Sequence, residues 1–377
     1  MEGRGGLGGG RAGRVVAASV VLVLLGAVTL SAQAVPTGRT TPQRTRELLS
    51  ALAHDSLQGR ATGEIGSIKA AAIISRVMQS LGLRPAGDDG FYQRVPAGVS
   101  QVTGRNGQPT MRLQPLASVA AMDSLPADRR RQVMNVIAIL PGSDPALRNE
   151  HVLVDAHYDH VGMRPRLDQA GNRIPGADSI YNGADDDASG VVAVLEIARQ
   201  LAQGPAPKRT IVFAAMTGEE IGLVGTEWYL AHPVLPLEQM AANLEIEMIG
   251  RPDSLAGGSG KGWLTGYERS TMGDALAARG IPLVQDPRPD QDFFRRSDNI
   301  AFAQTGIPAH TLSSFNLHTD YHQPSDEVDK VDFTHMAAVI NAAADAARLL
   351  ADGPKPEWKP GGRPCRQGEQ PRPGICG

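Results

Sequence analysis

The sequence predicts an α/β protein, a sandwich of helices around a largely parallel β-sheet. Short runs rich in Val and Ile, most of them of strand length, recur from residue 135 onward. Segments with the apolar spacing of amphipathic helices lie between them. Alternating strands and helices are typical of parallel sheets with helices on their faces, and 377 residues allow one large or two modest domains.

Two helices are expected before the first strand. Residues 40–55 offer Thr41 as N-cap and Pro42 as the first helical residue. The expected apolar face of this helix is Leu48, Leu49 and Leu52. Residues 66–82 predict a second helix that ends at Gly82, a residue suited to a C-terminal cap. Its apolar residues at roughly helical spacing are Ile68, Ile73, Val77 and Leu81.

The rest of the domain alternates between strands and helices. The expected strands are residues 135–140, 151–156, 210–215, 244–249 and 309–314. The expected helices are residues 190–201, 269–278 and 334–351. Residues 99–131 are polar and without a regular pattern, which indicates a surface excursion and no inserted domain. We therefore expect a single domain over residues 35–352.

The first 34 residues resemble an export signal. Arg4, Arg11 and Arg14 precede an apolar stretch at 15–30, and Ala32 and Ala34 supply small residues for cleavage. This pattern predicts a secreted or periplasmic protein with no stable membrane association after cleavage. An uncleaved membrane anchor is the alternative.

Residues 353–377 form a Pro- and Gly-rich tail that contains both cysteines of the chain, Cys365 and Cys376. In an exported protein a nearby pair is expected to form a disulfide. The net charge of −3 provides no basic surface of the kind that nucleic-acid binders carry, so nucleic acid is not expected as a partner.

Metal-binding residue types gather where the predicted strands end. His157 and Asp159 follow one strand, Glu219 and Glu220 follow the next, and Glu247 lies near the end of a third. Tyr321 and His322 lie downstream of the last strand. Because functional groups collect at the carboxyl ends of parallel strands, these side chains are expected to converge. His, Asp and Glu are the ligand set of a zinc site.

Three consecutive aspartates stand in "GADDDASG", residues 183–190, directly before a predicted helix. One carboxylate can bridge two cations through its two oxygens. A solvated helix N-terminus, where Asp is favourable, is the alternative. Glu219 and Glu220 allow a similar division of roles, because adjacent loop residues point apart: one can bind a metal and the other act as a base.

Several longer motifs resemble the metallopeptidases of family 28, co-catalytic zinc exopeptidases that include secreted bacterial aminopeptidases and glutamate carboxypeptidase. They are "LLSALAHDSLQGRATG", "NVIAILPGSDP", "AHYDHVG", "NGADDDASGVVAVLEIARQL", "TGEEIGLVGTEWY", "FFRRSDNIAFAQTGIPA" and "YHQPSDEVDKVDF". Together they cover most of the chain. The resemblance implies a three-layer α/β/α sandwich around a mostly parallel mixed sheet, the phosphorylase/hydrolase-like fold of zinc exopeptidases.

The resemblance also implies two zinc ions per chain. His157 and Glu247 would hold one ion, Glu220 and His322 the other, and Asp186 would bridge them. The peptide bond after a bridging Asp is commonly cis in this family. Asp185 and Asp187 are then expected to support the site and not to bind metal.

The remaining roles follow from the same resemblance. Glu219 is expected to be the general base and Asp159 the carboxylate that orients His157. Tyr321 matches a tyrosine that stabilises the oxyanion, with a packing role as the alternative. Two departures from the family pattern stand out: Glu247 replaces the usual Asp, and Asn299 replaces a common His.

The expected function is a secreted di-zinc aminopeptidase that hydrolyses N-terminal residues from peptides, using a metal-bridging water activated by a glutamate. A carboxypeptidase on the same fold is an alternative, with Arg295 or Arg296 as carboxylate anchors. A one-zinc glutaminyl cyclase is a second alternative, and a non-catalytic, receptor-like binding protein is a third.

Overall fold

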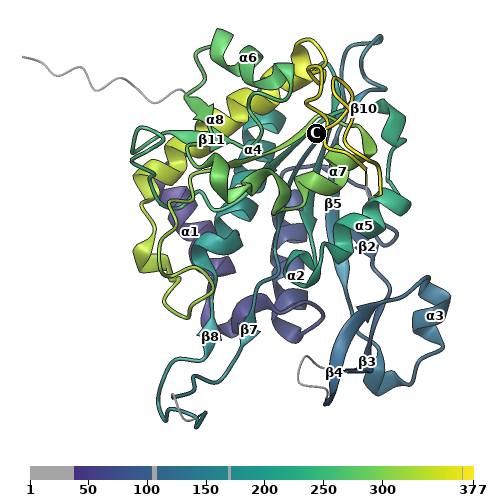
Figure 1. The fold of residues 1–377 in the computed structure, drawn as a ribbon, viewed down its shortest axis with the longest axis vertical. Helices are drawn as coiled ribbons and strands as arrows, with labels where there is room; N and C mark the ends of the chain where they lie inside the picture. Colours follow the sequence, from purple (N-terminus) through teal and green to yellow (C-terminus); the bar gives the residue numbers. More distant parts are fainter. Residues whose placement is uncertain (1–37, 104–107, 169–170, 367) are drawn as a thin grey trace, which may run out of the picture. The chain divides into compact units, whose positions relative to one another are not determined.

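The computed structural model describes residues 38–103, 108–168, 171–366 and 368–377, so the predicted export signal lies outside the described residues. A nine-stranded sheet forms the centre of the fold, in the order β1-β5-β9-β6-β10-β13-β11-β12, with β2 paired to β5 (Figure 1). Its strands are β1 (Arg84–Pro85), β2 (Tyr92–Arg94), β5 (Met134–Leu140), β6 (His151–His157), β9 (Thr210–Met216), β10 (Met240–Ile246), β11 (Gly262–Leu264), β12 (Leu283–Gln285) and β13 (Ala309–Ser313).

The sheet is mixed, and its central part is parallel. Strands β9, β6, β10 and β13 pair in parallel in that order. Strand β5 is antiparallel to β9, and β11 is antiparallel to β13. The carboxyl ends of the four central strands therefore meet at one edge of the sheet, which is where the functional residues are expected.

Helices cover both faces of the sheet, which confirms the predicted α/β sandwich. One face packs against α1 (Pro42–Leu52), α2 (Ile65–Ser80), α4 (Gly190–Gln203), α6 (Thr271–Ala278) and α8 (Phe333–Asp352). The other packs against α5 (Val224–Ala231) and α7 (Asn299–Thr305). Successive residues of β5 alternate between the two cores: Val136 and Ala138 face the first, Ile137 and Ile139 the second.

The first helix follows its prediction, whereas the second uses a different face. Thr41 Oγ1 accepts a hydrogen bond from the N–H of Arg44, and α1 begins at Pro42 as expected. In α2 the predicted apolar residues are only half-buried, and the fully buried apolar residues are Ala70, Ala71, Ile74 and Met78. This face approaches the neighbouring backbone closely at Gly66, where a Cβ would collide with the Leu57 carbonyl oxygen.

Residues 97–103 and 108–123 hold regular structure that the sequence did not predict. Strands β3 (Ala97–Thr103) and β4 (Pro109–Pro115) form an antiparallel hairpin, and α3 (Val119–Asp123) follows it. No residue of β4 is buried, and its apolar alternation, Met111 and Leu113, is too short to predict a strand. A second two-stranded sheet, formed by β7 (Gly162–Met163) and β8 (Ile180–Tyr181), also lies outside the main sheet.

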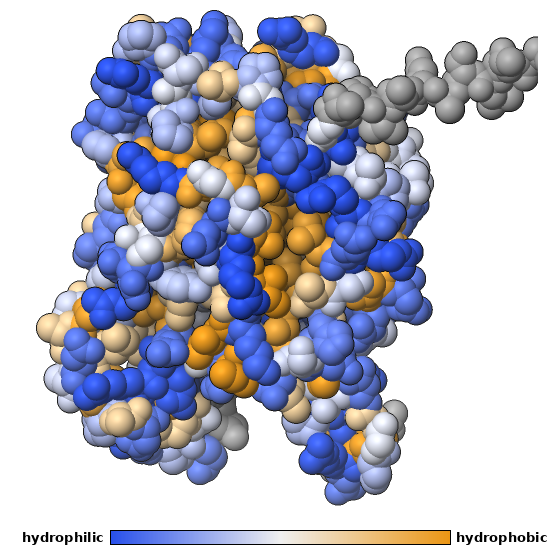
Figure 2. All heavy atoms as spheres, turned by 180° about the vertical axis from the view of Figure 1, so that it is seen from behind, coloured by the Kyte–Doolittle hydropathy of each residue, from blue (hydrophilic) through white to orange (hydrophobic). Residues whose placement is uncertain are grey.

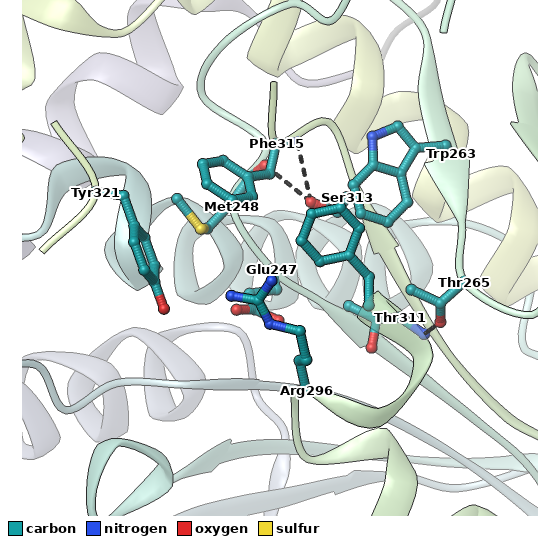
Figure 3. A pocket seen from close by; sticks show the side chains of 10 residues that line it. Glu247, Met248, Trp263, Thr265, Arg296, Thr311, Ser313, Phe315 and Tyr321 are labelled. Carbon is teal, nitrogen blue, oxygen red and sulfur yellow. Dashed lines mark hydrogen bonds between the residues drawn. The ribbon is translucent and has the colours of Figure 1, made fainter. Parts of the chain in front are cut away.

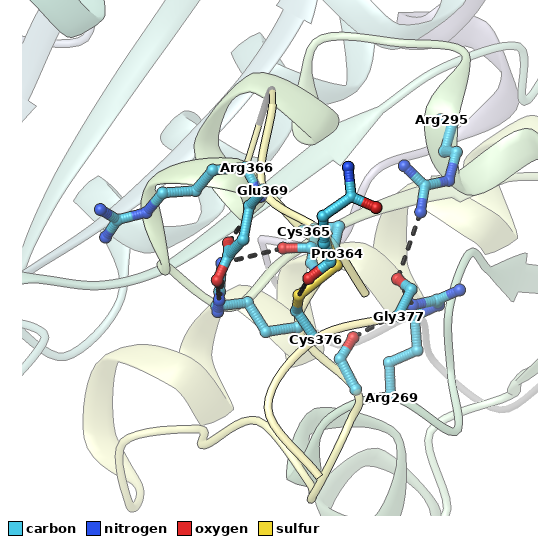
Figure 4. The surroundings of a disulfide bond; sticks show 11 residues. Arg269, Arg295, Pro364, Cys365, Arg366, Glu369, Cys376 and Gly377 are labelled. Carbon is cyan, nitrogen blue, oxygen red and sulfur yellow. Dashed lines mark hydrogen bonds and ion pairs between the residues drawn. A yellow bond between two sulfur atoms is a disulfide. The ribbon is translucent and has the colours of Figure 1, made fainter. Parts of the chain in front are cut away.

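The C-terminal tail is closed by a disulfide between Cys365 and Cys376, as predicted. Its last residue is anchored to the domain: the Gly377 carbonyl oxygen accepts hydrogen bonds from Arg269 Nη1 at 3.3 Å and Arg295 Nη2 at 3.2 Å (Figure 4). The Gly377 N–H donates to the Arg363 carbonyl.

The face opposite to that of Figure 1 carries hydrophobic residues along its middle, flanked by hydrophilic residues on both sides (Figure 2). Among the helices that the structure describes, none combines the length and apolar character required to span a membrane.

Candidate metal centre

The ends of three neighbouring strands deliver the predicted site residues to one edge of the sheet. His157 is the last residue of β6, Glu219 and Glu220 follow the end of β9, and Glu247 directly follows β10. Because β9, β6 and β10 are parallel neighbours, these carboxyl ends lie side by side. His322 enters from the loop after β13, with a positive φ of 53°.

Asp186 lies at the centre of these residues. It belongs to the turn Ala184–Ser189 that leads into α4, and the peptide bond to Asp187 is cis. Asp186 Oδ1 is 3.4 Å from His157 Nε2, whereas Oδ2 is 3.0 Å from His322 Nε2. The two oxygens of one carboxylate therefore face two different histidines, which is the arrangement that a bridging ligand requires.

Two groups of potential metal ligands share Asp186. The first contains His157, Asp186 and Glu247, and the second contains His160, Asp186, Glu220 and His322. Within each group the ligand atoms lie within 4.8 Å of one another. The structure thus brings together all five residues that the resemblance implies as ligands, and adds His160, which sequence reasoning missed.

The donor set fits a pair of zinc ions. Several of these buried atoms have no hydrogen-bond partner within the described protein: His157 Nε2, His160 Nδ1 and Nε2, Asp186 Oδ2 and Glu220 Oε1. Buried polar atoms are normally satisfied, so unpaired atoms that converge indicate a missing partner. Imidazole nitrogens and carboxylate oxygens are common zinc ligands.

The charges of the site stabilise one another. Burial opposes ionisation of Asp186, but His160, His157 and His322 outweigh it and hold the pKa of this carboxyl well below its usual range. Burial likewise opposes protonation of His322, but the adjacent carboxylates of Asp186 and Glu220 raise its pKa to about 10. In the absence of a cation, the imidazoles thus serve as counter-charges for the carboxylates.

The other two aspartates of the run support the turn, as the family resemblance implies. Asp185 Oδ1 accepts a hydrogen bond from the Gly250 N–H at 2.6 Å. Asp185 Oδ2 lies 3.0 Å from His318 Nε2. Asp187 Oδ1 accepts from the Gly190 and Met248 N–H groups, at 2.9 and 3.0 Å. Both side chains tie the Asp186 turn to neighbouring backbone.

Two buried supporting residues were not predicted. Arg60, 1% exposed, donates to the carbonyl oxygens of Tyr158, Leu52, Asn182 and Gly183. Asp326, completely buried, accepts from the N–H groups of Asp185 and Asp186. No local pattern reveals them, because each acts by bonding to backbone that is distant in sequence.

Glu219 lies beside the ligand groups and belongs to neither. Burial, and then repulsion by Glu247, raises its pKa to about 10 when no cation is present, although His157 opposes the shift. Its backbone N–H donates to Asp159 Oδ1 at 3.2 Å. His157 Nδ1 lies 3.2 Å from the Asp159 carbonyl oxygen and 3.9 Å from Oδ1, so its hydrogen bond goes to the backbone of Asp159.

A pocket with aromatic walls opens beside Glu247 (Figure 3). Its lining comprises Glu247, Met248, Trp263, Thr265, Phe293, Arg296, Thr311, Ser313, Phe315 and Tyr321. The Trp263 and Phe293 rings stack with centroids 5.2 Å apart. Tyr321 stacks on the ring of His322 at 4.0 Å, so it contributes to packing as well as to the pocket. Arg296 lies over the Phe293 ring, 5.0 Å from its centroid.

Asn299, which replaces a common His of the family, forms buried hydrogen bonds that connect neighbouring elements. It is buried at the start of α7, and its side chain donates to the Phe294 carbonyl at 3.0 Å. Its N–H donates to Glu245 Oε2. Glu245 is two residues before Glu247 and also accepts from the hydroxyls of Ser297 and Thr311. These bonds connect β10 to α7 and β13.

Comparisons with known proteins give a matching family model and similar sequences. The model of Peptidase family M28 matches residues 135–347. The chain is 26% identical over 308 residues to a probable leucine aminopeptidase 2 of Aspergillus oryzae (strain ATCC 42149 / RIB 40). That match covers 74% of this chain and 57% of the relative, so the chain spans little more than half of the relative's length.

Two solved structures illustrate the likeness of fold. An aminopeptidase from Aneurinibacillus sp. strain AM-1 has a TM-score of 0.55 at 17% identity, over 84% of this chain and 95% of that one. A glutaminyl cyclase of Porphyromonas gingivalis has a TM-score of 0.54 at 17% identity, over 81% of this chain and 97% of that one. At these identities the similarity concerns the fold alone.

Proposed function

The chain belongs to Peptidase family M28, and from this premise we propose that it is an exported aminopeptidase that uses two zinc ions to hydrolyse N-terminal residues from peptides. One observation carries the proposal. Asp186 directs one oxygen to His157 and the other to His322, and each histidine has a further carboxylate in its ligand group.

The proposed ligands divide between two ions. His157 and Glu247 would hold the first, Glu220 and His322 would hold the second, and Asp186 would be a ligand shared by both. When bound, such ions polarise the scissile carbonyl and lower the pKa of a water to about 7. Glu247 in place of Asp keeps a carboxylate at this position with a longer side chain, so the donor set is retained.

Glu219 is the proposed general base. It directly precedes the ligand Glu220 and is outside both ligand groups, which leaves its carboxylate available for proton transfer. Nearby cations favour the carboxylate form of a buried acid. Glu219 would take a proton from the attacking water and return it to the nitrogen of the departing peptide.

Tyr321 and Asp159 have supporting parts. Burial, and then the charge of Asp186, raises the pKa of the Tyr321 hydroxyl above its ordinary value, so it stays protonated and can donate a hydrogen bond to the oxyanion. Asp159 fixes both the ring of His157, through its carbonyl, and the loop of Glu219, through Oδ1. We assign Asp159 a positioning role.

The aminopeptidase function is supported by the carboxylates of Glu219, Glu220 and Glu247, which favour the ammonium group of a peptide N-terminus. The aromatic pocket next to Glu247 suits an apolar side chain of the first residue. A carboxypeptidase would depend on Arg295 or Arg296. Arg295 already donates to Gly377 of the tail, so only Arg296, which lines the pocket, is available as an anchor.

A glutaminyl cyclase and a non-catalytic binding protein are less well supported. A one-zinc cyclase does not require ligands for a second ion, and these are all present. A binding protein does not require an intact ligand set with a glutamate beside it. Export is proposed from residues 1–34 and from the Cys365–Cys376 disulfide, which is typical of oxidising compartments.

Metal reconstitution tests the proposal. The protein is stripped with a chelator and titrated with zinc, while release of free amino acids from a leucine-terminated peptide is measured. We expect the release of amino acids to increase with added zinc until two zinc ions are bound per chain. If activity instead saturates at one zinc ion per chain, and the protein releases ammonia from a peptide with an N-terminal glutamine, the protein is a glutaminyl cyclase. Undiminished hydrolysis in the stripped protein would refute a metal-dependent mechanism.

A further inference from the structure

We propose that His160 is a third histidine ligand of the metal pair and gives the second ion four protein ligands, against three for the first. This inference rests on the proposed two-zinc function. It adds a ligand to the five that the family resemblance implies, and it predicts that the two ions are held unequally.

The position of His160 is that of a ligand. Its Nδ1 lies 2.7 Å from Glu220 Oε1 and 3.7 Å from Asp186 Oδ2. His322 Nε2 approaches the same two oxygens, at 3.1 and 3.0 Å. The two imidazoles, with centroids 5.4 Å apart, thus converge on one pair of carboxylate oxygens. Two nitrogens and two oxygens are the four donors that zinc commonly takes.

Contacts with carboxylate oxygens distinguish His160 from the buried packing histidines of this protein, His151, His310 and His335. Both ring nitrogens of His310 are paired, with the Thr265 carbonyl and the Ser270 hydroxyl. Both ring nitrogens of His335 are also paired. In His160, whose side chain is 0% exposed, neither ring nitrogen has a hydrogen-bond partner among the described residues, and Nδ1 meets only proposed ligand oxygens. The buried ring of His151, at the opposite end of β6, also lacks hydrogen-bond partners but belongs to no ligand group. The carboxylate oxygens around Nδ1 therefore identify His160 as a ligand, and the missing partners alone do not.

The backbone holds this ring in place. Gly183 has a φ of 54°, and a Cβ at this position would lie 2.5 Å from His160 Cδ2. Arg60 donates to the Gly183 carbonyl at 2.9 Å, and the N–H of His160 donates to the Arg60 carbonyl at 3.3 Å. The imidazole is therefore confined between the Asp186 turn and Glu220.

An unequal pair follows from the ligand count. Zinc with four protein ligands resembles a closed site, whereas zinc with three keeps a position open for water or substrate. The open position would belong to the first ion, which His157, Asp186 and Glu247 hold and which lies beside the aromatic pocket. The second ion would be bound more tightly and leave last during chelation.

X-ray absorption at the zinc edge of the two-zinc protein counts imidazoles and so tests this directly. We expect three imidazoles per two zinc ions in the wild type and two in His160→Asn. The asparagine retains a donor toward Glu220 and would rescue a merely positional role. His318→Asn removes a buried imidazole that contacts Asp185 and lies outside both ligand groups, so its count should remain three.

A zinc titration provides a second readout. If His160 is a direct ligand, His160→Asn should weaken the tighter zinc-binding step more than about 100-fold. Replacing a residue that only orients a ligand typically weakens metal binding about 10- to 100-fold. Two imidazoles per two zinc ions in the wild type would overturn the inference and leave the proposed function standing. Fewer than two zinc ions in the wild type would instead contradict the proposed function. If His160→Asn does not fold, the wild-type count alone decides.

Discussion

The backbone N–H of Glu219 donates a hydrogen bond to Asp159 Oδ1 across 3.2 Å. Because Asp159 also accepts from Thr62 Oγ1 at 2.7 Å and contacts His157 Nδ1 through its carbonyl, one buried residue joins three segments. The proposed base and a proposed metal ligand are thus fixed relative to each other by Asp159.

Replacing Asp159 with Asn should lower kcat by about 10-fold, the lower end of the range for supporting partners in a metal site, because the carbonyl that contacts His157 remains. The amide keeps only one accepting oxygen for the two donors, the Glu219 N–H and Thr62 Oγ1. Zinc content by atomic emission should stay near that of the wild type. Thr62→Val, which removes only one donor, is the matched control with a smaller expected effect. Wild-type turnover in Asp159→Asn would exclude the positioning role.

Glu219→Gln should retain zinc and lose about 10²- to 10⁴-fold in kcat, the usual contribution of a general base. The amide has nearly the same shape but cannot take a proton from water. Glu220→Gln is the neighbouring control, and it should instead lower zinc content. Full activity of Glu219→Gln would remove Glu219 from the mechanism.

Asp186→Asn should lower the zinc content of both sites, because the amide offers one neutral oxygen where the carboxylate offers two charged ones. Asp185→Asn, at the adjacent residue, changes a supporting side chain and should retain more metal. Dialysis against a weak chelator followed by zinc analysis measures both variants. Two firmly bound zinc ions in Asp186→Asn would contradict the bridging role.

The stability of the fold should decrease below pH 6.5 partly through His310. Burial lowers the pKa of this imidazole to about 4, whereas it is about 6.5 in an unfolded chain. Between these values the unfolded chain binds a proton that the folded protein does not, so falling pH favours unfolding. From pH 7.5 to 5 the contribution is about 2 kcal/mol.

Urea unfolding of the wild type and of His310→Gln at these two pH values measures that contribution. The variant loses the bonds to Thr265 and Ser270 and should be less stable at pH 7.5, but its stability should fall less on acidification. An identical pH dependence in both proteins would mean that His310 does not stay neutral in the fold.

Gly190→Ala should destabilise the protein although Ala favours helices by about 1 kcal/mol. The added Cβ would collide with the Ile246 carbonyl oxygen and with the Asp187 carboxylate, and overpacking of this kind costs about 1–3 kcal/mol. Gly82→Ala is a control with open space around the Cβ, where only the positive φ of 71° opposes the change. Thermal melting distinguishes them, and a higher melting temperature for Gly190→Ala would contradict the close approach of α4 to β10.

The predictable part of the fold is the part in which side-chain pattern and burial agree. Residues 135–140 and 151–156 coincide with β5 and β6 to within one residue, because both strands are buried along most of their length and carry runs of branched aliphatic residues. Strand β10 begins at Met240 and ends at Ile246, whereas the expected strand is residues 244–249. Its start was missed because its first half contains alanines, which have little β propensity. In the hairpin of β3 and β4, the alternating pair Met111 and Leu113 is too short a pattern to predict a strand.

Some residues of the candidate site could likewise be predicted from the sequence, and others could not. The five proposed ligands follow from residue type at strand ends together with the family resemblance. His160 stands in the same short motif, "HYDH", but a histidine beside an identified pair gives no sign of whether its ring turns inward. Arg60 and Asp326 act on distant backbone, and only the three-dimensional structure reveals such contacts.

The central claim is tested most directly by one short peptide in three forms: with both ends free, with its N-terminus acetylated and with its C-terminus amidated. Each form is incubated with and without a chelator, and the released amino acids are identified. We predict that acetylation and chelation each abolish cleavage, whereas amidation does not. Cleavage that persists after acetylation and stops after amidation would contradict the account and identify a carboxypeptidase, with Arg296 as the first residue to replace.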